Sequence, residues 1–410
     1  MEEKKPKIRF KGFNNAWEQR KVSEITIFHK QGFYTTETYD ERKKYYLLRG
    51  TDLTDNQLIL KDTPKIDATD KDYLAFKTRV GDFLIVRSGT VGTYGIVYKE
   101  LPAIFGSYLI DFRFDKSQVT NEFFGLFYQS NLFVDQLRQI IQQSANTNIN
   151  AENIKSTSIK LPSIPEQKRI GEFFASIDNL ITLHQRKYEK LKTIKKSCLE
   201  KMFPKNGSMY PEVRFKGFTD AWEQRKLSDY LEVSNEKNTD DVYTKQDVLS
   251  VSGDYGIVNQ IEFQGRSFAG ASVSNYGVVH TNDIVYTKSP LNSNPYGIIK
   301  TNKGNAGIVS TLYAVYHPKE IVDSVFVQTY FEQHARMNNY MHPLVNKGAK
   351  NDMKVSSENA LKGDVVFPCI TEQSCIVALF MKLDSLITLH QRKLEKLKNI
   401  KKSMLEKMFE

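Results

Sequence analysis

The stretch LITLHQRK occurs twice in this chain, at Leu180–Lys187 and again at Leu386–Lys393. The match extends outward in both directions, because SIDNLITLHQRKYEKLKTIKKSCLEKMF at 176–203 returns as KLDSLITLHQRKLEKLKNIKKSMLEKMF at 382–409. Self-similarity on this scale indicates an internal duplication. The chain therefore consists of two related halves, each ending in the same kind of segment.

The openings of the two halves match as well. KIRFKGFNNAWEQRKVSEI at 7–25 corresponds to EVRFKGFTDAWEQRKLSDY at 212–230. Between these matched ends the halves share only an outline, for example GDFLIVRSGTVGTYGIVY at 81–98 against NDIVYTKSPLNSNPYGIIK at 282–300. Constant ends thus enclose a variable middle in each half.

Both repeated tails have the apolar spacing of a long helix, with seam residues at alternating steps of four and three and Lys195 as an exception. Pro165 suits a first helical turn and Pro204 a stop, which predicts a helix from SIPEQ to Phe203. Such a helix needs a partner for its seam, and the other copy is the obvious one. The expected seam includes Ile181, His184, Tyr188 and Leu191, with Ile387, His390, Leu394 and Leu397 in the second copy.

The two helices are expected to be antiparallel. The second variable region starts shortly after the first helix ends and finishes where the second helix starts, so a compact domain brings these two helix ends together. His184 and His390 would then face each other near the middle. They either fix the register as a polar pair in an apolar seam or serve as a zinc or proton site.

The variable middles read as mixed α/β. Strand-like segments such as YYLLRG, DFLIVRS, YGIVY and SYLIDFRF precede a helical stretch at about 121–143, and the second half repeats this order before a helix near 322–337. The predicted fold is mixed α+β, with two similar domains joined by two long antiparallel helices.

Composition supports a folded, soluble protein of more than one domain. The 410 residues are 40% hydrophobic and 12% aromatic, with three cysteines and no CxxC pair. No leader-like N-terminus or long apolar run is present, so we expect a cytoplasmic location.

Catalytic motifs are sparse. NPYG at 294–297 lacks one proline of an amino-methyltransferase motif and reads as a loop, and GTVGTYG at 89–95 lacks the context of a phosphate-binding loop and reads as a turn. No triad, nucleophile elbow or metal motif stands out. The sequence favours binding over catalysis.

The charge is concentrated on the repeated helices. Formal net charge is +10, and each helical tail carries a run of Lys and Arg, in the first copy Arg186, Lys187, Lys190, Lys192, Lys195 and Lys196. Such a run is either a solvated helix face or a surface for phosphates or an acidic protein.

A variable region, a helix opening with P-x-x-E-Q, a second variable region and a second helix together resemble the specificity subunit of type I restriction-modification systems. The matching residues are the RFKGF…AWEQRK openings, the LPSIPEQKRI and FPCITEQSCI helix starts, and the paired helices. Two departures are Thr371 in place of the helix-start proline and SANTNIN in the loop before the first helix.

The resemblance implies two target-recognition domains, at 1–162 and 205–368, and two spacer helices, at 163–204 and 369–410. Each domain would read one half of a bipartite site on double-stranded DNA. Two modification subunits would dock on the helices and methylate adenine, and restriction subunits would join for cleavage. S-adenosylmethionine, ATP and Mg²⁺ would be bound by these partner subunits, and this chain would bind no cofactor and catalyse no reaction.

Base readers are expected among polar side chains of the variable loops, since Arg pairs with guanine and Asn with adenine in the major groove. The candidates are Arg49, Arg87, Ser88 and Thr90 in the first domain and Lys288, Asn292, Asn294, Lys347 and Lys350 in the second. Two rival interpretations remain open, a tandem adaptor for protein or glycan ligands and a standalone enzyme.

Overall fold

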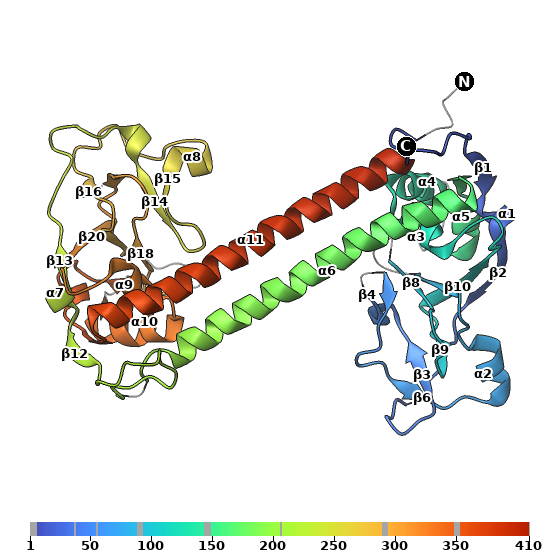
Figure 1. Cartoon of the computed structure of the whole chain (residues 1–410), viewed down its shortest axis with the longest axis horizontal. Coiled ribbons are helices and arrows are strands. Elements are labelled where there is room, and N and C mark those ends of the chain that lie inside the picture. Colours follow the sequence, from blue (N-terminus) through green and yellow to red (C-terminus); the bar gives the residue numbers. More distant parts are fainter. Residues whose placement is uncertain are drawn as a thin grey trace. The chain divides into compact units, whose positions relative to one another are not determined.

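The computed structural model describes residues 6–36, 38–54, 56–87, 93–142, 149–205, 207–288, 294–347 and 353–409. The chain divides into two compact units, one formed by residues 1–184 with 392–410 and the other by residues 185–391. Two long helices, α6 (Ile164–Lys201) and α11 (Ile370–Phe409), each contribute one segment to either unit (Figure 1). Helix α6 begins and ends within two residues of the predicted bounds.

The centre of the first unit is an antiparallel four-stranded sheet of order β2-β10-β7-β8. Its strands are β2 (Thr26–Gln31), β7 (Phe83–Val86), β8 (Tyr94–Ile96) and β10 (Leu109–Phe114). A smaller sheet of order β6-β3-β9 lies beside it, and β4 pairs with β5. These strands are β3 (Tyr45–Leu48), β4 (Leu53–Thr54), β5 (Gln57–Leu58), β6 (Lys65–Ile66) and β9 (Ala103–Phe105).

The described part of the first unit also contains the short helices α1 (Val22–Ile25), α2 (Asp70–Phe76), α3 (Asn121–Gln129), α4 (Asn131–Gln142) and α5 (Ala151–Lys155). Alternate residues of the central sheet are buried on opposite faces, as the two-residue period of a strand requires. Phe83 and Phe112 join a core with α3 and the ends of the long helices, whereas Leu84 joins a second cluster with Leu48.

The second unit repeats the central sheet with order β13-β20-β17-β18. Its strands are β13 (Leu231–Val233), β17 (Ile284–Thr287), β18 (Ile299–Thr301) and β20 (Tyr313–Pro318). The surrounding elements repeat those of the first unit only in part. They are α7 (Leu227–Tyr230), the hairpin β14 (Leu249–Ser252) with β15 (Gly256–Asn259), α8 (Gln260–Gln264), the pair β16 (Gly277–Val279) with β19 (Gly307–Val309), α9 (Ser324–Phe331), α10 (His334–Met341), and the pair β21 (Asn346–Lys347) with β22 (Met353–Lys354).

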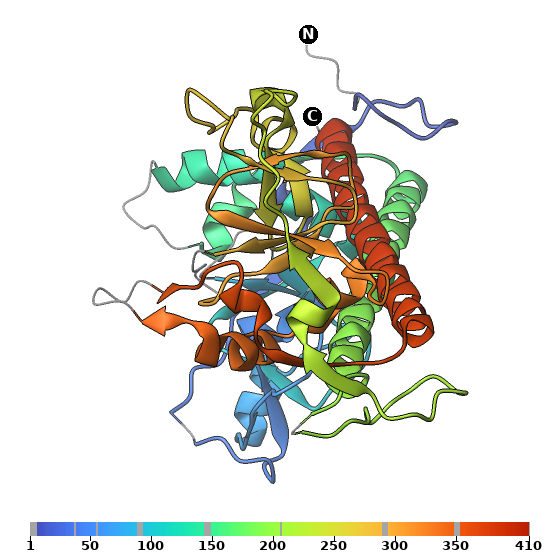
Figure 2. The same ribbon diagram turned by 90° about the vertical axis from the view of Figure 1, so that its left-hand side faces the viewer.

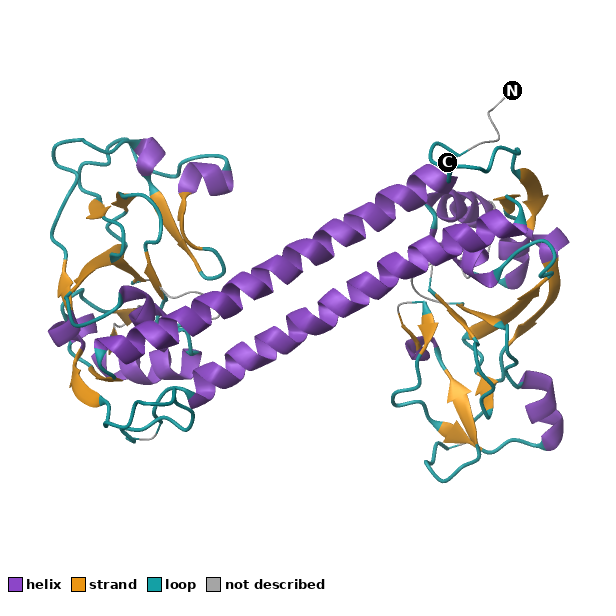
Figure 3. Ribbon diagram, in the orientation of Figure 1, coloured by secondary structure: helices purple, strands orange, loops and turns teal. Residues whose placement is uncertain are grey.

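Figure 3 shows helix, strand and loop mixed within each unit, which confirms the predicted α+β class. In one respect the prediction was wrong, because each single helix expected after the strands is two helices. In the first unit Ser130 separates α3 from α4. Its hydroxyl donates to the carbonyl of Phe127 at 2.6 Å and accepts from the N–H of Phe133 at 3.2 Å, so one residue ends a helix and caps the next. In the second unit the extended residue Gln333 separates α9 from α10.

Within each unit the segments of α6 and α11 run antiparallel, as predicted (Figures 1 and 2). In the first unit Asp178 pairs with Lys401, while Phe174, one turn earlier, shares a core with Leu405, one turn later. In the second unit Lys195 pairs with Asp384, and the rings of Phe203 and Phe380 lie 6.1 Å apart.

Candidate functional site

The residues that repeat between the halves form a buried clamp at the start of each long helix. Arg9 binds Glu166 through two hydrogen bonds of 2.7 and 2.8 Å, and Arg214 binds Glu372 with the same two distances. Both carboxylate side chains are 1% exposed. The RFKGF opening and the E-Q pair of the helix start therefore recur because they hold each other, over 157 and 158 residues of chain.

The glutamine that follows each clamp glutamate joins the helix to its domain. Gln167 accepts from the N–H of Thr120 at 2.9 Å and donates to the carbonyls of Gln118 and Pro162. Gln373 makes the equivalent bonds, accepting from Asp323 and donating to Ile321 and Pro368. Helix α11 starts at the position equivalent to the start of α6, so Thr371 in place of proline does not move the helix start.

The far end of each helix is anchored by an aromatic contact in the other unit's core. Phe409 of α11 lies 6.3 Å from the ring of Trp17 and 5.3 Å from Phe123, in the first unit. Phe203, just after α6, lies 6.1 Å from the ring of Trp222 in the second unit. The repeated AWEQRK segments thus supply the tryptophans, and their EQRK residues form β1 (Glu18–Lys21) and β12 (Glu223–Lys226), which pair with β11 (Ser158–Leu161) and β23 (Asp364–Phe367).

The lysine in each seam is neutralised inside its own unit. Lys195 lies 2.7 Å from Asp384 and 2.6 Å from Glu332, and Lys401 lies 2.6 Å from Asp178. Burial works to lower the pKa of Lys195, but Glu332 and Asp384 raise it overall. The expectation that Lys195 belongs to an outward basic face is wrong, because its side chain is only 15% exposed and its ammonium group pairs with Glu332 and Asp384.

The predicted seam residues are buried or half-buried. Leu394 is buried, and the side chains of the other seven are half-buried, namely Ile181, His184, Tyr188, Leu191, Ile387, His390 and Leu397. Among the described residues no group of three or more His, Cys, Asp or Glu side chains could hold a metal ion.

Two candidate base readers occupy equivalent positions in the two domains. Arg87 directly follows β7, and Lys288 directly follows β17. Their backbone N–H groups donate to the carbonyls of Tyr108 (2.9 Å) and Leu312 (3.3 Å), whose side chains are 69% and 65% exposed. Burial, and secondarily the charge of Lys237, lowers the pKa of Lys288. Each domain therefore places a cationic residue beside a large exposed side chain at the same edge of its central sheet.

Arg49 lies at a groove near this edge in the first domain. The groove has a volume of about 570 Å³ and is lined by Phe33, Tyr34, Thr35, Tyr39, Leu47, Leu48, Arg49, Gly50, Thr51, Val86, Thr93, Gly106, Ser107 and Tyr108. The Arg49 guanidinium donates to the carbonyl of Asp62 at 2.8 Å, and its backbone N–H donates to the Asp52 carboxylate at 2.7 Å. Part of its role is thus to hold the loop.

Sequence reasoning missed the aromatic side chains of this groove. Tyr34, Tyr39 and Tyr108 are 76%, 59% and 69% exposed. The sequence signal that could have found them is the presence of tyrosines in loops rich in Thr and Gly. Large apolar side chains that cluster on an exposed surface often mark a binding site.

The remaining candidates are less informative. Asn294 opens a turn closed by a 2.9 Å bond from the N–H of Gly297, so NPYG is a loop, as predicted. Lys347 belongs to β21. Ser88, Thr90, Asn292 and Lys350 lie outside the described residues, as does most of GTVGTYG.

The central sheet of the first domain carries a buried charged cluster. Arg113 binds Asp82 at 2.6 Å and Asp111 at 3.0 Å, and the two carboxylate side chains are at most 1% exposed. Burial first, and the charge of Asp82 second, raise the pKa of Asp111 to about 8. The second domain has Val315 at the position equivalent to Asp111, paired with Val285 as Asp111 is with Leu84.

Comparison with known proteins agrees with this architecture. Residues 14–193 match the family model described as the type I restriction modification DNA specificity domain. A putative type I restriction enzyme MjaX specificity subunit from Methanocaldococcus jannaschii is 23% identical over 95% of this chain and 92% of its own length. The type I restriction enzyme EcoBI specificity subunit from Escherichia coli is 24% identical over 38% of this chain and 34% of its own length.

A solved structure shares the whole fold. The crystal structure of a type I restriction-modification system S subunit from M. genitalium superposes with a TM-score of 0.56 at 13% identity, covering 99% of both chains. The chain is thus similar to type I restriction-modification specificity subunits, by the family model over residues 14–193 and by a curated relative over 95% of its length. No helix in the described part of the chain has the length and apolar character that a membrane span requires.

Proposed function

We propose that each variable domain reads one half of a bipartite site on double-stranded DNA, and that α6 and α11 set the gap between the halves. The observation that carries this proposal is that the buried arginine–glutamate clamp occurs once in each half of the chain. The Arg9–Glu166 clamp recurs as Arg214–Glu372, and both units have the same four-stranded central sheet, while the loops around the sheets differ. Two domains with the same sheet and different loops are suited to recognising two different short DNA sequences.

The residues that would contact bases lie at the sheet edge where β7 ends in the first domain and β17 ends in the second. Arg87 and Lys288 stand at equivalent strand ends, and Arg49 adds a second guanidinium beside the aromatic groove of the first domain. Arg binds guanine through two donors, and lysine reaches the same acceptors. Ser88 and Thr90 follow Arg87 closely in sequence, and Asn292 and Asn294 follow Lys288; these four stay candidates, as do Lys347 and Lys350.

The chemistry is assigned to partner subunits. Two modification subunits dock on the helices and methylate adenine at N6 with their own S-adenosylmethionine, and restriction subunits using ATP and Mg²⁺ join for cleavage. This chain recognises the DNA sequence and binds no cofactor. The absence of a motif that would activate a nucleophile or a methyl donor in the sequence supports this division.

A domain exchange tests the proposal. Residues 28–150 are replaced by the corresponding region of a relative, which leaves Arg9, Trp17, Glu166 and both helices in place. Sequencing of methylated adenine in cells that carry the chimera should show one half-site changed and the other unchanged. A change in both halves would contradict two independent readers.

A binding measurement tests the DNA contact itself. Affinity of the assembled complex for its site should fall steeply with salt, with a log–log slope of about −0.9 per phosphate neutralised. An adaptor for protein or glycan ligands would bind DNA weakly and without preference for the methylated sequence.

A further inference from the structure

The groove beside Arg49 in the first domain has a volume of about 570 Å³ and combines exposed rings with an apolar lining. Three exposed tyrosines border it, namely Tyr34, Tyr39 and Tyr108, and we call it the tyrosine groove. The buried side chains of Leu47 and Leu48 form part of its lining. The groove thus offers flat aromatic faces and apolar surface in one hollow.

Backbone contacts fix the shape of the tyrosine groove. The N–H of Phe33 donates to the carbonyl of Phe105 at 2.8 Å, and the N–H of Gly106 donates to the carbonyl of Leu48 at 2.9 Å. A Cβ at Gly106 would lie 2.8 Å from the carbonyl oxygen of Leu48, and a Cβ at Gly32 would overlap the carbonyl of Gly106. Because the chain segments approach as closely as only glycine permits, the groove is already formed without a ligand.

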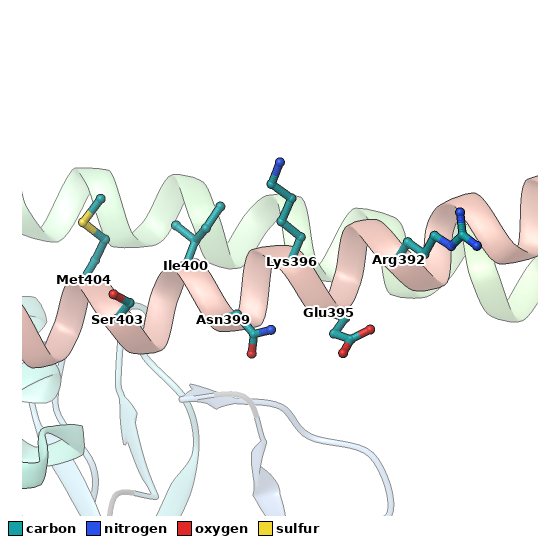
Figure 4. A pocket seen from close by; sticks show the side chains of 7 residues that line it. All are labelled: Arg392, Glu395, Lys396, Asn399, Ile400, Ser403 and Met404. Atoms are coloured by element: carbon teal, nitrogen blue, oxygen red, sulfur yellow. The ribbon is translucent and has the colours of Figure 1, made fainter. Parts of the chain in front are cut away.

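The charge of the tyrosine groove suits a ligand that carries phosphate. Among the described residues that line it, Arg49 is cationic and none is Asp or Glu. Other pockets in the described part of the chain have carboxylates. The groove of about 460 Å³ along α11 includes Glu395 (Figure 4), and the pocket of about 840 Å³ beside α8 includes Asp247 and Glu262. A nucleotide would be repelled by these carboxylates and not by the tyrosine groove.

The concave shape restricts which part of a DNA duplex could enter. Base edges lie at the floor of the major groove, about 8.5 Å deep, where only a protruding protein element reaches them. A hollow accepts only a group that projects from the duplex, which is either a phosphate with its sugar or a base turned out of the stack. Phosphate oxygens need N–H or hydroxyl donors, whereas a base turned out of the stack has free faces that pack on aromatic rings.

Hydroxyl groups of the tyrosine groove are available to the edge of such a base. Thr51, Thr93 and Ser107 line the groove, and their side chains make no hydrogen bond with another described residue. A hydroxyl both donates and accepts, so it can pair with an exocyclic amine or with a carbonyl oxygen. The groove therefore has stacking surfaces and hydrogen-bonding groups for one nucleobase.

We propose that the tyrosine groove binds one nucleobase that is turned out of the duplex within the first half-site and stacks on Tyr108. This inference rests on the proposed function and adds the class of ligand that the groove takes. In the second domain Leu312 is equivalent to Tyr108, since each accepts the backbone N–H that follows β17 or β7. Leucine has no ring for stacking, so the second half-site gives up no base in this way.

The test measures the affinity of the assembled complex for duplexes with the methylated site, by fluorescence anisotropy. One nucleotide of the first half-site at a time is made abasic, which leaves the opposite base unpaired. Turning out an unpaired base costs least, so affinity should rise about tenfold or more at the position whose base enters the groove, and stay or fall elsewhere. The methylated adenine and its partner are omitted, because a methyltransferase turns out its own target.

Variants show whether the tyrosine groove causes this gain in affinity. Tyr108→Leu, which copies Leu312, should abolish the gain, and Tyr34→Ala should reduce it about fivefold or more, because stacking on a ring is lost. Tyr108→Phe keeps the ring and should keep the gain. The matched control is Tyr98→Ala, since Tyr98 is 64% exposed in the same domain and lies outside the tyrosine groove. This control should gain affinity as the parent does.

The outcomes separate the inference from the function on which it rests. If the unaltered complex does not prefer the methylated sequence, the proposed function is wrong. If it prefers that sequence but gains affinity at no position, or if Tyr108→Leu and Tyr34→Ala keep the gain, the inference is overturned. Equal weakening on every duplex by Tyr108→Leu would place the ring against an intact duplex and overturn it too. If the variants bind DNA normally but lose a subunit in native mass spectrometry, the groove holds a protein segment instead.

Discussion

Lys401 of α11 lies 2.6 Å from Asp178 of α6, and Lys195 of α6 lies 2.7 Å from Asp384 of α11. The chain thus forms one ion pair twice, with the two helices exchanging roles. The lysine side chains are only 18% and 15% exposed, so each carboxylate compensates a largely desolvated charge within its unit. The pair fixes which helical turns meet, which an apolar seam alone specifies poorly.

Removing one partner of this pair should destabilise the first unit. Asp178→Ala leaves Lys401 without a carboxylate, and we expect a loss of about 1–3 kcal/mol in the free energy of unfolding. Replacing both residues by leucine should recover most of that loss, because no charge is left unpaired. Urea unfolding followed by Trp17 fluorescence, in a Trp222→Phe background, reports on this unit. Equal stability of Asp178→Ala and its parent would contradict a stabilising pair.

The buried clamp should be more costly to break. Arg9→Ala strands Glu166, which is 1% exposed, and we expect about 3–5 kcal/mol of destabilisation in the first unit. Arg214→Ala should do the same to the second unit through Glu372, with Trp222 as reporter in a Trp17→Phe background. Adding Glu166→Gln to Arg9→Ala should restore part of the stability. If Arg9→Ala destabilised the second unit, or Arg214→Ala the first, the assignment of the clamps to their units would be wrong.

Stability of the first unit should fall as the pH rises toward 8. Burial raises the pKa of Asp111 from 3.8 to about 8, so the folded chain keeps a proton that the unfolded chain releases. The stability this group contributes is complete below about pH 4 and is lost as the pH climbs through about 8, at no more than about 1.4 kcal/mol per pH unit.

Asp111→Val, which copies Val315 of the second domain, should remove this slope and leave Arg113 paired with Asp82. Urea midpoints of parent and variant between pH 5 and pH 8.5, read by Trp17 fluorescence, measure the difference. The variant should gain most at the alkaline end. Parallel curves would mean that Asp111 is ionised throughout this range.

Lengthening both helices should widen the gap in the DNA site. Duplicating Lys190–Thr193 and Lys396–Asn399 adds four residues to each helix, or about 6 Å at 1.5 Å per residue. The insertions leave the pairs Asp178–Lys401 and Lys195–Asp384 intact, because each pair joins a residue before one insertion to a residue after the other. Coiled coils absorb a four-residue insertion by slight unwinding.

With DNA rising about 3.4 Å per base pair, the gap between methylated half-sites should grow by one or two base pairs while the bases read stay the same. Sequencing of methylated adenine gives the gap directly. A seven-residue insertion should be less active, since roughly three extra base pairs rotate one half-site by about 100° while a heptad keeps the domain's facing. If the four-residue variant is active and its methylated sites keep the original gap, the helices do not set the gap length.

The sequence by itself determined the duplication, the two long helices and their antiparallel pairing. Repeats and a seam of apolar residues at steps of three and four are local signals, and LITLHQRK lies within both helices as expected. The second variable region connects the end of the first helix to the start of the second. If that region is compact, these two helix ends lie close together, and the helices must be antiparallel. Several strand segments of the middles could also be predicted, since buried strands such as the one in DFLIVRS are continuous apolar runs.

Only the tertiary structure decided what the repeated polar residues do. Arg9 and Glu166 are 157 positions apart, so no periodicity connects them, and Lys195 reads as part of a solvated basic run until Asp384 and Glu332 are placed beside it. The break at Ser130 escaped the sequence because a helix continuing and a helix capped anew have the same apolar spacing. The sequence alignment set Arg87 against Lys288, but only strand register placed Tyr108 beside Arg87 and Leu312 beside Lys288, because hydrogen bonds between distant segments set which residues share a sheet edge.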